Sequence, residues 1–148
     1  MTGTRARGSQ WQYAEDVDAT GRMEPLARVM STNALSFGFP YQRAQRGILF
    51  VRRANLRGMA VGLTIERGRF FCGIRGCFVN VQFDSGPVQR FRADETDDHS
   101  KTTLLINHGA GFIPQLRRAK TVTVVAAFFQ GETGVLQFIV DGFRWPYQ

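Results

Sequence analysis

The sequence predicts an all-β protein that folds as a single antiparallel β-sandwich with one short helix. Apolar residues recur at every second position in most segments, which is the spacing of a strand with one buried face. Turn residues separate these segments at intervals of roughly 8 to 12 residues, as in sandwiches and barrels. The chain also has 13 phenylalanines among its 148 residues, and aromatic side chains suit a half-buried pleated surface. We therefore expect about nine or ten short strands.

The N-terminal part predicts a tail, an edge strand, a loop and a further strand. Residues 1–10 are polar and are expected to form a flexible tail, and residues 11–148 a single β-sandwich domain. Residues 11–13 alternate and predict an edge strand, whereas residues 14–25 are polar and predict a connecting loop. Alternation begins after residue 25 and ends at Pro40, because proline has no amide hydrogen to donate to a sheet.

The middle of the chain predicts four strands. Residues 48–51 form a continuous apolar run and are expected to be buried on both faces. In residues 59–65, larger apolar side chains alternate with smaller or polar ones, which is one of the clearest strand patterns in the chain. Residues 77–83 and 88–93 alternate in the same way, and the Asp-Ser-Gly-Pro sequence at 84–87 predicts a tight reversal between them.

The C-terminal part predicts three strands and the helix. Residues 102–107 form a short strand. A helical spacing then appears between residues 111 and 120, on a face formed by Phe112, Leu116 and Ala119. Basic residues at the end of this segment complement the negative end of the helix dipole. Residues 121–130 and 135–140 are rich in strand-forming residues and predict a hairpin.

The chain carries a net charge of +7, and arginine accounts for 17 of its 19 basic residues. Because a guanidinium group binds carboxylate or phosphate in a two-pronged fashion, such a surface attracts nucleic acid, acidic lipid or acidic proteins. The arginines are scattered, however, whereas a nucleic-acid binder clusters them, and a GC-rich genome produces the same bias. An anion-binding site is kept as an alternative, with the candidate residues Arg43, Arg46, Arg52, Arg53 and Arg57.

Cys72 and Cys77 are the only two cysteines, and they lie where one alternating segment ends and the next begins. We expect a structural disulfide at the tip of a β-hairpin. A zinc site is disfavoured, because zinc normally takes four ligands and His99 and His108 are not spaced as a ligand pair. A redox motif is also disfavoured, because a redox pair is usually Cys-x-x-Cys at a helix start. In a reducing compartment the two cysteines would be small buried hydrophobic residues. No metal site and no cofactor is predicted.

For the other candidate residues, too, a structural role is a better interpretation than a functional site. Four carboxylates offer oxygen ligands for calcium, but their spacing matches no EF-hand, so a solvated acidic loop is expected: Asp94, Glu95, Asp97 and Asp98. No catalytic residues are predicted, because no Gly-x-Ser-x-Gly turn accompanies His99 or His108. Six aromatic residues either form a surface that stacks on sugars or bases, or close the ends of the sandwich: Trp11, Tyr13, Phe39, Tyr41, Trp145 and Tyr147.

Six short motifs together resemble a known group of proteins. They are Trp11-x-Tyr13, Ser31-x-Asn33, Phe39-Pro40-Tyr41, Gly68-x-Phe70-x-Cys72, Cys77-x-Val79-x-Val81-x-Phe83-Asp84 and Phe138-x-Val140-x-Gly142-Phe143-x-Trp145. The chain resembles small, uncharacterised exported β-sandwich proteins of Gram-negative bacteria and their mobile elements, which often carry a signal or lipoprotein leader. The resemblance spans nearly all of residues 11–145 and implies a fold, with no activity or catalytic residues attached.

These observations predict a non-enzymatic binding or protein-interaction domain of the bacterial envelope or periplasm, with a protein or envelope component as its partner. No segment approaches the roughly 20 consecutive apolar residues of a membrane-spanning helix. The first nine residues carry positive charge with no apolar segment behind them, so no signal peptide is predicted. The alternatives are a cytoplasmic module that binds nucleic acid or other anions, and a hydrolase that uses His99 or His108.

Overall fold

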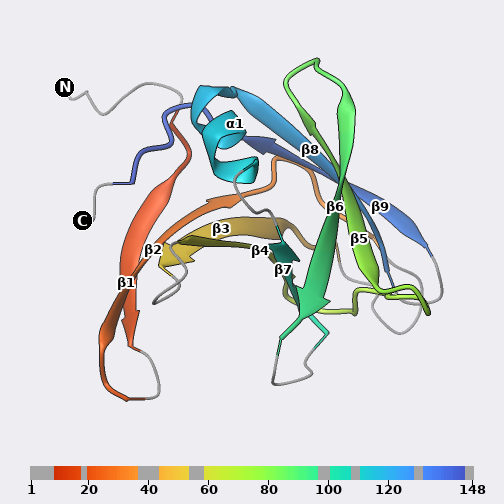
Figure 1. Cartoon of the computed structure of the whole chain (residues 1–148), viewed down its shortest axis with the longest axis horizontal. Coiled ribbons are helices and arrows are strands. Elements are labelled where there is room, and N and C mark those ends of the chain that lie inside the picture. Colours follow the sequence, from red (N-terminus) through yellow and green to blue (C-terminus); the bar gives the residue numbers. More distant parts are fainter. Residues whose placement is uncertain are drawn as a thin grey trace.

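The computed structural model describes residues 9–17, 20–36, 44–53, 59–96, 101–107, 111–128 and 132–145. Most of the predicted tail, residues 1–8, lies outside these ranges. The described residues confirm the all-β fold, with one short helix, α1 (Phe112–Arg118), inside the predicted range 111–120 (Figure 1). The strands are β1 (Gln12–Val17), β2 (Met23–Met30), β3 (Gly47–Arg53), β4 (Met59–Ile65), β5 (Cys77–Phe83), β6 (Val88–Glu95), β7 (Thr103–Asn107), β8 (Thr121–Ala127) and β9 (Thr133–Ile139).

All of these strands belong to one antiparallel sheet with the order β1-β2-β3-β4-β7-β6-β5-β8-β9. Strand β6 joins the two halves of the sheet, because it pairs with β5 over most of its length and with β7 near its end. The two separate sheets of the predicted sandwich are therefore not confirmed. Figure 1 shows instead a strongly bent sheet, in which β5, β6, β8 and β9 turn away from the part formed by β1 to β4 and β7.

The hydrophobic core lies on one face of this sheet and is completed by α1. Alternate residues of the strands point into it, and Val61 of β4 and Val124 of β8 are fully buried. The helix contributes Phe112, whose ring centroid lies 5.1 Å from that of Phe83 and 5.3 Å from that of Phe91. Burial of a side chain of this kind stabilises the fold by roughly 1.5–3 kcal/mol. Among the described residues, no helical segment has the length and hydrophobicity that crossing a bilayer requires.

Two sequence predictions are wrong in detail. Residues 14–25, predicted as a loop, contain most of β1 and the start of β2, and the chain reverses near Gly21. They are polar because β1 is an end strand of the sheet and much of this hairpin is exposed. Residues 48–51 are fully buried only on the core face, since the ring of Phe50 lies on the other face, over Gly62.

The other end strand, β9, is covered by the segment that follows β2. The side-chain amide of Asn33 donates to the carbonyl oxygen of Val135 at 2.8 Å and accepts from the backbone N–H of Gln137 at 2.9 Å. The backbone N–H of Thr32 donates to the carbonyl oxygen of Gln137 at 2.7 Å. These bonds take the place of a tenth strand, so they block this edge from pairing with another chain.

Trp11 closes one end of the core. Its side chain is buried, its Nε1–H donates to the carbonyl oxygen of Val140 at 2.8 Å, and its ring centroid lies 4.7 Å from that of Phe143. This residue therefore acts as a core aromatic with a satisfied polar atom. Of the other aromatic residues considered as a stacking surface, Trp145 packs against the core, and Phe39, Tyr41 and Tyr147 lie outside the described residues.

Asp84 ties the turn after β5 to the start of β8. Its carboxylate oxygen Oδ1 accepts the backbone N–H groups of Lys120 at 2.8 Å and Thr121 at 3.0 Å. These two hydrogen bonds, together with the positive charge of Lys120, lower the pKa of Asp84 below its ordinary value of 3.8. The residue has a φ of +53°, in a region that Asp and Asn adopt more readily than other side chains.

Replacement Asp84→Asn keeps this backbone conformation but removes the charge, so we expect a loss of stability that depends on pH. Because folding lowers the pKa of Asp84, its contribution is complete above 3.8 and is lost as the pH falls through the lower folded value. The difference in urea midpoint between wild type and Asp84→Asn, followed by tryptophan fluorescence, should therefore narrow as the pH falls from about 4 to about 2. A difference that stays constant over this range would show that the charge of Asp84 does not stabilise the turn.

Candidate functional site

A groove of about 610 Å³ lies on the outer face of β2, β3 and β4. Met30, Ile48 and Thr64 form one row across these strands, because Met30 pairs with Ile48 and Ile48 pairs with Thr64. Their side chains point away from the core, since the neighbouring positions on each strand are buried. Ile65 and Glu66, at the end of β4, continue the lining. The volume is in the range of sites that bind small molecules or side chains.

The lining continues through Ala34 and through residues 44–46, which lead into β3. Gln45 holds these residues to the end of β4, and only 6% of Gln45 is exposed. Its Nε2 donates to the carbonyl oxygen of Arg67, and its Oε1 accepts the backbone N–H of Arg67, both at 2.7 Å. The side-chain amide thus bonds to Arg67 as a neighbouring strand would, and it holds residues 44–46 beside the segment that follows β4.

Ser31 positions the charged group at the rim. Ser31 is fully buried, and its hydroxyl donates to the carbonyl oxygen of Asn33 at 2.7 Å and accepts the backbone N–H of Gly47 at 2.9 Å. The carbonyl oxygen of Ser31 accepts from Nε of Arg46 at 2.6 Å. The guanidinium group is therefore fixed at one side of the groove, and the exposed carboxylate of Glu66 also borders it.

The lining that the structure describes is mostly apolar. The described lining includes no histidine, cysteine or serine, and the hydroxyl of its only threonine, Thr64, bonds to Thr102 and Thr103. Met30, Ile48 and Ile65 supply apolar surface to the groove, and Arg46 and Glu66 supply charged groups. Such a site accommodates an apolar group whose neighbours are polar or charged.

Of the five arginines predicted to bind anions, the structure describes three, and these three do not form one patch. Arg46 borders the groove, whereas Arg52 lies six residues farther along the same face, about 20 Å away at the rise of a strand. Arg53 is on the opposite face by strand alternation. Arg43 and Arg57 lie outside the described residues. Of the described candidates, only Arg46 belongs to a recognisable site.

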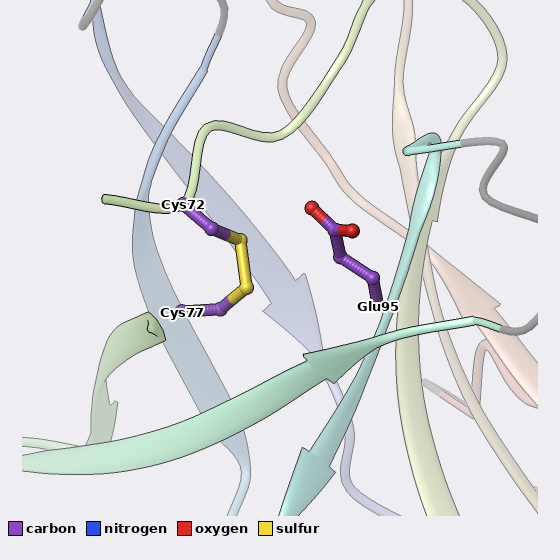
Figure 2. Close-up of side chains that lie close together, drawn as sticks. All are labelled: Cys72, Cys77 and Glu95. Carbon is purple, nitrogen blue, oxygen red and sulfur yellow. A yellow bond between two sulfur atoms is a disulfide. The ribbon is translucent and has the colours of Figure 1, made fainter. Parts of the chain in front are cut away.

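Cys72 and Cys77 are joined by a disulfide, as predicted, with their Cα atoms 4.5 Å apart (Figure 2). The bond closes a tight turn in which Gly73 pairs with Gly76, and the φ of +109° at Gly76 favours glycine. The predicted hairpin does not extend beyond this turn, because β5 already pairs with β6 and β8. The backbone N–H of Phe71, the residue before Cys72, donates to the carbonyl oxygen of Ala127 instead.

The structure describes the other candidate sites only in part. Asp94 and Glu95, considered as calcium ligands, lie in β6 and point to opposite faces by strand alternation, so they cannot act as neighbouring ligands in a loop. Asp97 and Asp98 lie outside the described residues, as do His99 and His108, on which the hydrolase alternative depends.

Sequence reasoning missed a second exposed cluster, on the outer face of β5 and β6. The guanidinium carbon of Arg90 lies 3.9 Å from the ring centroid of Phe78, and that of Arg92 lies 5.5 Å from it. Phe78 pairs directly with Arg92 across the two strands. The alternation of Arg90 and Arg92 with less exposed residues predicts an exposed face, but only the register brings Phe78 between them.

No protein-family model matches this chain, and neither the curated proteins nor the solved structures contain a match. The resemblance to exported β-sandwich proteins therefore stays a prediction.

Replacement Gln45→Met keeps the size of the side chain but removes both bonds to Arg67. Since a buried N–H or C=O group without a partner costs about 1–3 kcal/mol, we expect a loss of stability in this range, measured by urea unfolding. Gln137→Met, on the exposed face of β9, is the control and should change stability by less than about 0.5 kcal/mol. Equal effects of the two replacements would contradict the role assigned to Gln45.

Proposed function

We propose that this protein is a non-enzymatic binding domain whose groove takes an apolar side chain from an acidic segment of a protein partner. The observation that carries the proposal is the row of Met30, Ile48 and Thr64 beside a fixed guanidinium group. Met30 is 39% exposed, so apolar surface is available in the groove. A partner side chain that covers it gains roughly 25 cal/mol for each Å² of apolar surface removed from water.

The charges of the protein support an acidic partner. A net charge of +7 attracts acidic segments over a distance and speeds their encounter with the groove. At contact, Arg46 is held by Ser31, so less side-chain freedom is lost when it pairs with a carboxylate. Glu66 also lines the groove, and its carboxylate disfavours a second acidic group beside it.

The bacterial envelope or periplasm is the compartment we propose for this interaction. Disulfides form and persist in oxidising compartments, and Cys72 and Cys77 are paired. The resemblance to exported β-sandwich proteins supports the same location.

Replacement Met30→Glu should abolish binding of the proposed ligand class, because it places a charge in the groove. The probe is a panel of short synthetic peptides with one Leu or Phe flanked by Asp or Glu, together with a matched panel in which Lys replaces the acidic residues. We expect the acidic peptides to shift the methyl NMR signals of Met30 and Ile48. Affinity should fall at least about 10-fold in Met30→Glu, which corresponds to about 1.4 kcal/mol.

Met23→Glu is the matched control, because Met23 lies on the same strand, is 58% exposed and does not line the groove. It should bind the acidic peptides like wild type, and both variants should retain the wild-type circular dichroism spectrum. Equal binding of acidic and Lys-containing peptides, or equal weakening by the two replacements, would refute the proposed ligand class.

Anion binding at Phe78, Arg90 and Arg92 is a second candidate function. The guanidinium carbons of Arg90 and Arg92 lie over the ring of Phe78, at 3.9 and 5.5 Å from its centroid, and both arginines are exposed. Two such groups on one exposed face offer paired donors to phosphate oxygens, and Phe78 offers an aromatic surface between them. Because Arg90 and Arg92 lie close together, they are better placed to bind a polyanion than the arginines that the sequence analysis named.

A short single-stranded DNA oligonucleotide tests this candidate. If Arg90 and Arg92 contact phosphates, the affinity should fall steeply with salt, and the slope of log K against log salt should decrease by about 1 for each arginine replaced by glutamine. Arg52→Gln, on a different part of the sheet, should leave the slope unchanged. The absence of binding at low ionic strength would exclude this function.

A further inference from the structure

We propose that Cys72, Cys77 and Glu95 form a zinc site when the disulfide is reduced. This site is separate from the groove, and it makes the protein a zinc binder in one redox state only. The inference begins from a cluster of three potential ligands that come from two parts of the chain: the turn before β5 and the end of β6.

The register of β5 and β6 brings the third ligand to the cysteines. Cys77 pairs with Ala93, and Glu95 lies two residues farther along β6 on the same face. Figure 2 shows the carboxylate of Glu95 beside the disulfide. The two sulfur atoms and a carboxylate oxygen all lie within 4.8 Å of one another.

Reduction turns these atoms into a suitable ligand set. A dithiol or phosphine reductant supplies two electrons, the S–S bond breaks, and two protons give the free thiols. When Zn²⁺ binds, the thiols release these two protons and coordinate as thiolates. Tetrahedral coordination, with Zn–S distances near 2.3 Å, places two sulfur atoms about 3.8 Å apart. Side-chain rotation at the cysteines provides this separation once the S–S bond is broken.

The choice of zinc follows from the donor types. Thiolates are soft ligands that favour zinc over calcium or magnesium, and one carboxylate completes a three-ligand set. Three protein ligands leave the fourth tetrahedral position for water. Cys77 is only 6% exposed and Cys72 is partly buried, so the protein shields one side of the site.

Lys101 balances the charge of the proposed site. Its Nζ lies 3.2 and 3.3 Å from the two carboxylate oxygens of Glu95. Zinc with two thiolates and one carboxylate carries a net charge of −1, which the ammonium group neutralises. The backbone of Lys101 is held in place, since its carbonyl oxygen accepts the N–H of Phe70 at 2.8 Å. Lys101 is thus placed to orient Glu95 from outside the ligand set, a role that tunes metal affinity.

The test compares the full chain in its oxidised and reduced states. After treatment with a phosphine reductant, its anaerobic removal and addition of Zn²⁺, the reduced wild type should retain one zinc per chain through gel filtration, and the oxidised protein none. Glu95→Gln should weaken zinc binding by at least about 10-fold, and Lys101→Met by about 10-fold, within the range known for outer groups. Asp94→Asn is the matched control, because Asp94 is the adjacent exposed carboxylate on the other face of β6, and it should bind zinc like wild type.

A second measurement on the wild type keeps the test decisive if a variant fails to fold. X-ray absorption at the zinc edge of the reduced, loaded protein should show two sulfur and two oxygen or nitrogen neighbours. A reduced protein that retains no zinc, a zinc ion with only oxygen or nitrogen neighbours, or unchanged affinity in a folded Glu95→Gln variant would each overturn the proposal.

Discussion

The pairing of β6 with both β5 and β7 is the constraint on which the rest of the structure depends. It joins the two halves into one bent sheet, so that a single continuous face collects the core. The same strand then presents its alternate residues to two different surroundings. Phe91 and Glu95 face the core side, where Glu95 meets the cysteines, while Arg90 and Arg92 face outward beside Phe78. One register thus positions both the proposed zinc ligands and the exposed arginine cluster.

The segment after β2 has two roles that a longer strand would not combine. Asn33 covers the edge of β9, and two residues earlier Ser31 holds Arg46 at the groove. In both cases a side chain bonds to a backbone carbonyl oxygen: the amide of Asn33 to Val135, and the guanidinium group of Arg46 to Ser31. The segment therefore needs no regular strand of its own. Gln45 does the same toward Arg67. Protection of the sheet edge and construction of the groove therefore depend on one short, strongly bonded region.

The sequence predicts the class of the fold, the helix, the disulfide and most strands, because each of these depends on local spacing. The alternation of apolar residues at 59–65 indicates that one face of the strand is buried, but it does not indicate what covers that face. It therefore cannot distinguish two layered sheets from one bent sheet. The sequence of β1 is polar and therefore predicts a loop, because a strand at the end of a sheet needs few apolar residues. Met30, Ile48 and Thr64 are ordinary outward positions in the sequence, and only the register places them in one row. Glu95 reads as part of an acidic run, because its approach to Cys77 depends on the pairing of β6.

We expect this fold to accommodate both redox states of the cysteine pair. The disulfide closes a loop of only a few residues, so in the chain-entropy model it contributes about 2 kcal/mol, out of a typical total stability of 5–15 kcal/mol. Other interactions hold the turn, because Gly76 bonds to Gly73, Phe70 to Lys101 and Phe71 to Ala127 through their backbones. We therefore expect reduction to free the two sulfur atoms while leaving them opposite Glu95. The compartment in which the protein resides then decides which state is present, and the groove, on the outer face of β2 to β4, is built without either cysteine.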